Sequence, residues 1–177
     1  KRRIRFIQKE VYGFSFIIYQ FKIARTSLRE MHENGWKIIY LNRTDLFDQM
    51  ISHQVAFKKN NWHNIKTQET EKVEQSEFFE LDLEMCIKSL KDTQDIRESE
   101  KKLLKDLPHF SVNYERDIQV STRHQETLDG VFDYLGLPSF VLKPPKYQKV
   151  FSKPYNEIVL NYSVIRNTAI SEGLIKP

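Results

Sequence analysis

A short apolar stretch that turns directly into a helical pattern constrains the fold of this chain more than any other feature. Residues 36–41, WKIIYL, are apolar except for one lysine, which is typical of a strand buried on both faces of a parallel sheet. Asn42 and Arg43 end this strand, and Thr44 or Asp45 can cap the helix that follows. The apolar positions of that helix lie near one face: Leu46, Phe47, Met50, Ile51, Val55 and Ala56.

The rest of the chain continues to alternate between strand and helix patterns. Residues 12–21, YGFSFIIYQF, predict a second buried strand, and residues 22–34 predict a short helix that Gly35 ends. The remaining predictions are a polar connection over 60–80, a charged helix over 81–107, a strand over 110–115, a helix over 124–138, a basic loop over 140–154 and a helix over 155–174. This alternation predicts a single α/β domain over residues 1–177, with a parallel sheet flanked by helices.

Composition and charge limit the class of protein. The 177 residues are 40% hydrophobic, which suffices for a core. The sequence contains no run of 18 apolar residues, so it predicts no transmembrane helix. The net charge of +4 suits an anionic ligand but is too small to indicate nucleic acid. Cys86 is the only cysteine, so no internal disulfide forms and we expect a reducing, cytoplasmic location. Because Lys1 follows no initiator methionine, we also expect an N-terminally incomplete chain.

Arg43 stands where open parallel sheets bind ligands, beyond the C-terminal end of a strand. A guanidinium group can hold a phosphate through two parallel hydrogen bonds, and the next helix adds its positive N-terminal end. Ser52 lies roughly 10 Å further along that helix, within reach of a phosphate that a leaning arginine side chain also contacts. The alternative is a surface arginine that pairs with an aspartate, and a serine that faces solvent.

The block GWKIIYLNRTDLFDQMISHQVAFKKNNWH resembles the strand–helix segment of bacterial sulfotransferases, the group that includes carbohydrate and lipid sulfotransferases. That family has an arginine at the end of the strand, a serine nine positions later, an alanine and often a Trp-His pair. The matching residues are Arg43, Ser52, Ala56, Trp62 and His63. VNYERDI, LDGVFDYLGLP and EIVLNYSVI resemble later elements of the family, so the resemblance covers residues 11–174.

The resemblance implies a P-loop NTP-hydrolase-like sulfotransferase fold and the donor 3′-phosphoadenosine 5′-phosphosulfate, with adenosine 3′,5′-bisphosphate as product and no metal. Arg43 and Ser52 would bind the 3′-phosphate. Lys149, with Lys146 or Tyr147, would fold over the nucleotide from the basic loop, unless that loop is merely solvated. The acceptor would be a hydroxyl of a carbohydrate or of a lipid-linked molecule.

The sequence departs from the family pattern at two places. The glycine- and serine-rich loop that cradles the 5′-phosphosulfate is absent, which implies a fold without its first strand. Ser15 stands where related sequences often carry a lysine. The alternatives are therefore a truncated or catalytically silent nucleotide-binding relative, a small-molecule kinase, and an interaction module built on the helix over 81–107.

Two histidines are candidates for a catalytic base. His63 lies beside Trp62 near the end of the phosphate helix, and His109 starts a strand from which it could face a cleft. A lone histidine is more often structural, so the base stays open. Glu115 and Asp117 alternate along the strand pattern, which favours ion pairing or helix capping over catalysis. No spacing of histidines and cysteines indicates a metal site.

Overall fold

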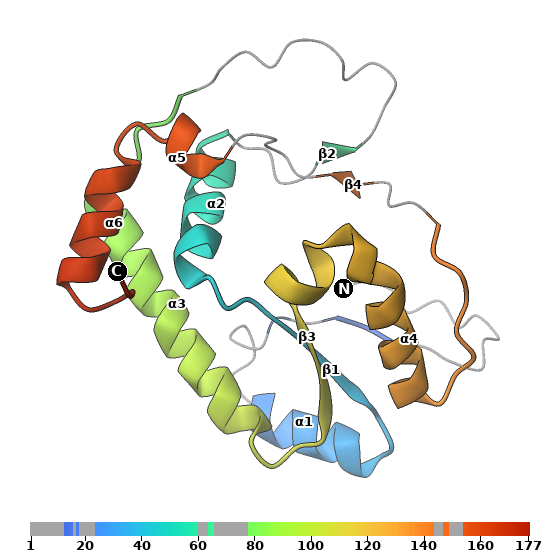
Figure 1. The fold of residues 1–177 in the computed structure, drawn as a ribbon. Coiled ribbons are helices and arrows are strands. Elements are labelled where there is room, and N and C mark those ends of the chain that lie inside the picture. The colour runs from blue at the N-terminus through green and yellow to red at the C-terminus, as the bar shows by residue number, and fades with distance from the viewer. Residues whose placement is uncertain are drawn as a thin grey trace.

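The computed structural model shows an α/β fold that consists mostly of helices around a two-stranded parallel sheet (Figure 1). It describes residues 13–15, 17, 24–59, 64–65, 78–143, 147–148 and 154–177. The helices are α1 (Ala24–Glu33), α2 (Leu46–Lys59), α3 (Leu83–Leu104), α4 (His124–Leu135), α5 (Tyr155–Ile158) and α6 (Tyr162–Ser171). The strands are β1 (Ile38–Asn42), β2 (Asn64–Ile65), β3 (His109–Asn113) and β4 (Tyr147–Gln148).

Strands β1 and β3 form the parallel pair at the centre of Figure 1. Their register runs from Ile38 opposite His109 to Asn42 opposite Asn113, which confirms the prediction that the apolar stretch belongs to a parallel sheet. The two strands therefore end side by side, and the residues that follow them meet at one edge.

The prediction that β1 is buried on both faces is wrong. Ile39 and Leu41 are 43% and 59% exposed, whereas Ile38 and Tyr40 pack against a buried cluster of Leu28, Leu104 and Leu107. Side chains alternate between the two faces of a strand. In the part of the chain that the structure describes, only one face of β1 is covered.

Helices α1, α2, α3 and α4 lie close to their predicted positions, and local signals fix several of their ends. The Asp45 side chain accepts a hydrogen bond from the Asp48 N–H (2.7 Å) and caps α2. The Asp82 side chain does the same for Met85 (2.8 Å) at the start of α3. Helix α4 ends at Gly136, whose φ of 74° is the left-handed conformation that favours glycine.

The main core lies where α2, α3 and the two C-terminal helices come together on one side of the molecule (Figure 1). Its buried side chains are Phe47, Met50, Ile51, Val55, Phe79, Leu81, Cys86, Ile87, Leu90, Ile158, Val159, Ile165 and Ala169. The predicted apolar face of α2 supplies four of these residues. The core thus fixes α2 and, with it, the segment that joins α2 to β1.

The C-terminal segment forms two helices, so the prediction of one helix over 155–174 is wrong. Between α5 and α6 the backbone of Val159 forms a parallel bridge with Phe79. The Asn161 side chain accepts from the Leu81 N–H (3.0 Å) and donates to the Leu81 carbonyl (2.7 Å). These contacts with a distant segment replace helical hydrogen bonds and break the helix.

Three other predictions change or fall partly outside the described residues. The strand predicted over 110–115 ends at Asn113 and a π-helical turn, Tyr114–Ile118, follows, so Glu115 and Asp117 do not alternate on a strand. Of the strand predicted over 12–21, residues 13–15 and 17 are described and lie in no strand. The connection over 60–80 contains β2, which pairs antiparallel with β4, and its remainder lies mostly outside the described residues.

Candidate functional site

Arg43 lies between the end of β1 and the first turn of α2, as the sequence predicted. The turn that follows the neighbouring strand β3 brings Tyr114 and Glu115 to the same edge of the sheet. Ligand sites of open parallel sheets form at this edge. The candidate site is therefore built around Arg43.

Arg43 makes three contacts that hold its side chain in one position. Its Nε donates to Glu115 Oε1 (3.2 Å) and its Nη2 donates to Asp48 Oδ2 (2.9 Å). The guanidinium carbon lies 4.3 Å from the centre of the Tyr114 ring, within the range of a cation–π interaction. Only 19% of the Arg43 side chain is exposed. Arg43 therefore pairs with an aspartate, as in the alternative interpretation of the sequence, and it also pairs with a glutamate.

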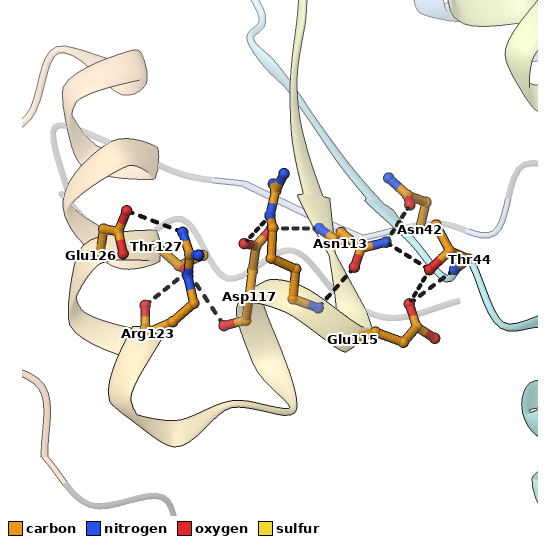
Figure 2. Close-up of polar contacts among 9 residues, drawn as sticks. Asn42, Thr44, Asn113, Glu115, Asp117, Arg123, Glu126 and Thr127 are labelled. Atoms are coloured by element: carbon orange, nitrogen blue, oxygen red, sulfur yellow. Dashed lines mark hydrogen bonds and ion pairs between the residues drawn. The ribbon is translucent and has the colours of Figure 1, made fainter.

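Glu115 connects the ends of the two parallel strands. Its Oε2 accepts hydrogen bonds from the Thr44 N–H (2.9 Å) and the Thr44 hydroxyl (3.0 Å), as Figure 2 shows. Partial burial raises the pKa of Glu115, but these bonds and that from Arg43 outweigh burial and lower the pKa from 4.5 to about 2. Glu115 is therefore ionised at neutral pH, and ion pairing is its role, as the sequence favoured.

The position of Glu115 depends on the turn after β3. The Asn113 side chain accepts from the Arg116 N–H (2.8 Å), and the Asp117 side chain accepts from the Asn113 N–H (2.7 Å). This reciprocal capping ends the strand at Asn113 (Figure 2). The Asn113 amide also donates to the Asn42 side chain (3.2 Å), which ties the turn to the end of β1.

Ser52 belongs to the same group of side chains through Tyr155. Ser52 lies on α2 one turn beyond Asp48, and its side chain is hydrogen-bonded to that of Tyr155 at the start of α5. Burial raises the pKa of Tyr155, and the charges of Asp48 and Arg43 act on the same phenol. Arg43 and Ser52 therefore both lie near enough to Tyr155 to act on its phenol.

His109 does not join this group. His109 starts β3 at the end of the sheet opposite Arg43, five residues or about 16 Å away along the strand. A ring nitrogen of His109 is 2.7 Å from the Leu107 carbonyl oxygen, and the ring packs edge-on against Tyr40. His109 therefore lies apart from the side chains around Arg43.

Of the other predicted site residues, the structure describes Tyr147 alone. His63, Lys146 and Lys149 lie outside the described residues. Tyr147 belongs to β4 and pairs with Ile65 of β2. The backbone thus places part of the predicted basic loop beside the segment that follows α2.

The sequence did not indicate the roles of four residues in the site. These are Thr44, as a hydrogen-bond donor to Glu115, and Asp48, Tyr114 and Tyr155. Asp48 had a recognisable signal, because an acidic residue in the first turn of α2 follows Arg43 closely. Tyr114 and Tyr155 had none, since they are 71 and 112 positions from Arg43 in the chain.

Neither a metal site nor a membrane-spanning helix is found in the part of the chain that the structure describes. Within the described ranges, no three or more His, Cys, Asp or Glu side chains are placed to hold a metal ion. No helix of the same ranges combines the length and the apolar character needed to cross a membrane.

The fold and the site define an α/β protein with a paired arginine at the C-terminal edge of its parallel sheet. Comparisons of the chain with protein-family models, with curated proteins and with solved structures found no match.

Proposed function

We propose that this chain is a sulfotransferase of the P-loop-like fold, which transfers a sulfuryl group from 3′-phosphoadenosine 5′-phosphosulfate to a hydroxyl of a carbohydrate or lipid-linked acceptor. One observation supports this proposal above all. Arg43 and Ser52, nine positions apart, both act on the Tyr155 phenol, Ser52 through a hydrogen bond and Arg43 through its charge. The sulfotransferase resemblance assigns the 3′-phosphate of the donor to the same two residues.

The chemistry of these side chains suits a phosphate. Arg43 has five N–H groups, of which one on Nε and one on Nη2 donate to oxygens of the described residues. The Nη1 group donates to no oxygen in that part of the chain, so one end of the guanidinium is available to an anion. Ser52 and Tyr155 add neutral hydroxyls, and the N-terminal end of α2 adds a positive potential.

Sulfuryl transfer depends on such positioning. The transferred group lies in line between the attacking and the leaving oxygen, and charge spreads over its other oxygens. A donor fixed by its 3′-phosphate presents its sulfuryl group in one orientation. We assign donor binding to Arg43 and Ser52 and assign no catalytic base.

Isothermal titration with adenosine 3′,5′-bisphosphate, and separately with 5′-AMP, tests the proposal. We expect binding that requires the 3′-phosphate. Arg43→Ala should weaken it from several-fold to about a hundredfold, because a hydrogen bond to a charged group contributes roughly 1.5–3 kcal/mol. Arg29→Ala is the matched control, since Arg29 is an exposed arginine of α1.

Two results would contradict the proposal. Equal affinity for the two nucleotides would show that no 3′-phosphate site exists. Unchanged affinity in Arg43→Ala, in a variant with a wild-type circular dichroism spectrum, would remove Arg43 from that site.

A second candidate is a catalytically silent relative that keeps the fold. The observation that favours it is the neutralisation of Arg43 by two carboxylates, Asp48 and Glu115. Binding of adenosine 3′,5′-bisphosphate without sulfuryl transfer to any sugar or lipid acceptor would support this candidate.

A further inference from the structure

Tyr114 differs in charge from the other partners of Arg43 that the structure describes. Asp48 and Glu115 are carboxylates, and their negative charge opposes the approach of a phosphate. The guanidinium carbon of Arg43 also lies over the Tyr114 ring, 4.3 Å from its centre. An aromatic ring attracts a cation through its quadrupole and adds no net charge. Tyr114 can therefore hold Arg43 without repelling an anionic ligand.

The ring and the two carboxylates contact different parts of the guanidinium group. Nε and one N–H of Nη2 donate to Glu115 and Asp48, so each carboxylate takes up an N–H group at the rim. A ring that lies over the central carbon leaves the other N–H groups at the rim available. These N–H groups are the ones that a phosphate would use, so the contact with Tyr114 does not compete with it.

The fold fixes the backbone on both sides of Tyr114. Tyr114 is the first residue of the π-helical turn after β3, and Asn113 caps that turn. The Asn113 amide donates to the Asn42 side chain at the end of β1 (3.2 Å). On the other side, Glu115 accepts two hydrogen bonds from Thr44 (2.9 and 3.0 Å). The turn therefore holds the ring in place against the end of β1.

Tyr114 also lies near the second residue that we assign to the phosphate. Burial is the main cause that raises the pKa of Tyr155, and the charge of the Tyr114 phenol raises it further. The same Tyr155 phenol is hydrogen-bonded to Ser52. Tyr114 therefore contacts Arg43 directly and lies close to the tyrosine that holds Ser52.

We propose that Tyr114 is a positioning residue of the donor site, whose ring holds the Arg43 guanidinium in the orientation that receives the 3′-phosphate. This inference rests on the proposed function, because it assumes that the phosphate binds to Arg43. An arginine side chain loses much rotational freedom when it is ordered, and a partner that orders it before the ligand arrives lowers that cost on binding. The ring alone supplies this effect, and the Tyr114 hydroxyl is not needed for it.

The test is isothermal titration of adenosine 3′,5′-bisphosphate into the wild-type chain, Tyr114→Phe and Tyr114→Leu. Phenylalanine keeps the ring and removes the hydroxyl, whereas leucine keeps an apolar side chain and removes the ring. We expect Tyr114→Phe to bind within about twofold of wild type and Tyr114→Leu to bind about five- to tenfold more weakly. Circular dichroism checks the fold of each variant, and Tyr114→Met, which also lacks a ring, replaces a leucine variant that does not fold.

Two further variants show whether Tyr114 acts through Arg43. Tyr134→Leu is the matched control, because it removes another ring that lies under a cation, Lys37 Nζ at 5.2 Å. Lys37 precedes β1, at the end of the sheet opposite Arg43, so the affinity should stay within about twofold of wild type. In Arg43→Ala, adding Tyr114→Leu should cause no further loss of affinity, because no guanidinium is left for the ring to hold.

The outcomes separate this inference from the proposed function. Unchanged affinity in Tyr114→Leu, an equal loss in Tyr114→Phe, or a further loss when Tyr114→Leu is added to Arg43→Ala would each overturn the inference and leave the donor site standing. If the wild-type chain does not distinguish the bisphosphate from 5′-AMP, the proposed function fails and the inference fails with it.

Discussion

Replacing Glu115 by glutamine tests whether the charge of this carboxylate holds the two strand ends together. Glutamine has nearly the same shape and keeps one oxygen for Thr44, but it cannot form the ion pair with Arg43. The pKa of Glu115 is about 2 in the folded protein, against 4.5 for an unperturbed side chain. The ionised form is therefore favoured by folding.

The magnitude follows from that difference. One pKa unit corresponds to about 1.4 kcal/mol, so the full difference gives at most about 3 kcal/mol. Because the Glu115 side chain is 24% exposed, solvent screening reduces the expected loss in Glu115→Gln to about 2 kcal/mol at pH 7. For a domain of this size such a loss lowers the melting temperature by about 4–8 °C.

The dependence on pH gives the sharper test. A carboxylate with a lowered pKa contributes its full stability above about pH 4.5, and this contribution disappears as the pH falls toward 2. We therefore expect the difference in unfolding free energy between wild type and Glu115→Gln to fall to about half or less when the pH is lowered from 7 to 3. Urea denaturation at the two pH values measures it.

A surface glutamate provides the control for this experiment. Glu126 pairs with Arg123 (3.1 Å), but its side chain is 71% exposed, so Glu126→Gln should change stability by about 0.5 kcal/mol or less at either pH. A loss in Glu115→Gln that is equally large at pH 3 and pH 7 would refute the electrostatic argument. No loss at pH 7 would show that the network does not stabilise the fold.

Two further predictions concern the core. Asn161→Ala removes both hydrogen bonds to Leu81 (3.0 and 2.7 Å) and should lower the unfolding free energy by about 2 kcal/mol; an unchanged urea midpoint would contradict this role. Cys86 is fully buried, and burial raises its pKa to about 11, so the native protein should not react with an aromatic disulfide reagent at pH 8, whereas the unfolded chain should release one equivalent of chromophore. Rapid reaction of the native protein would disprove the burial.

The elements that the sequence predicted well are those with local causes. The apolar positions of α2 recur with the period of a helix, and Asp45 caps it through a bond that spans three residues. Gly136 ends α4 because its backbone conformation favours glycine. None of these features needs information about distant parts of the chain.

The predictions that failed depend on contacts between distant segments. The apolar run of β1 does not reveal which face a helix covers, so the exposure of Ile39 and Leu41 was not predictable from it. Likewise, alternation of Glu115 and Asp117 suits a strand, but the mutual hydrogen bonds of Asn113 and Asp117 end β3 earlier. Competing side-chain bonds of this kind outweigh a weak periodicity.

The contacts of the site also divide into those with local causes and those that depend on distant segments. Arg43 lies at one strand end and Ser52 on the helix that follows, so their placement on these consecutive elements was predictable. Glu115 reaches Arg43 only because β1 and β3 pair in parallel, and Tyr155 reaches Ser52 only because α5 packs on α2. Both contacts arise from the tertiary structure.

The ion pairs of Arg43 are compatible with a ligand-binding role for physical reasons. A guanidinium that is only 19% exposed cannot remain without partners, because an unsatisfied buried charge costs several kcal/mol. An arginine destined for a phosphate therefore needs a substitute anion while its site is empty. Glu115 alone would satisfy a structural arginine that links two strands, and it is fixed by Thr44. Asp48 supplies a second carboxylate to the same guanidinium, so Arg43 is held between two anions.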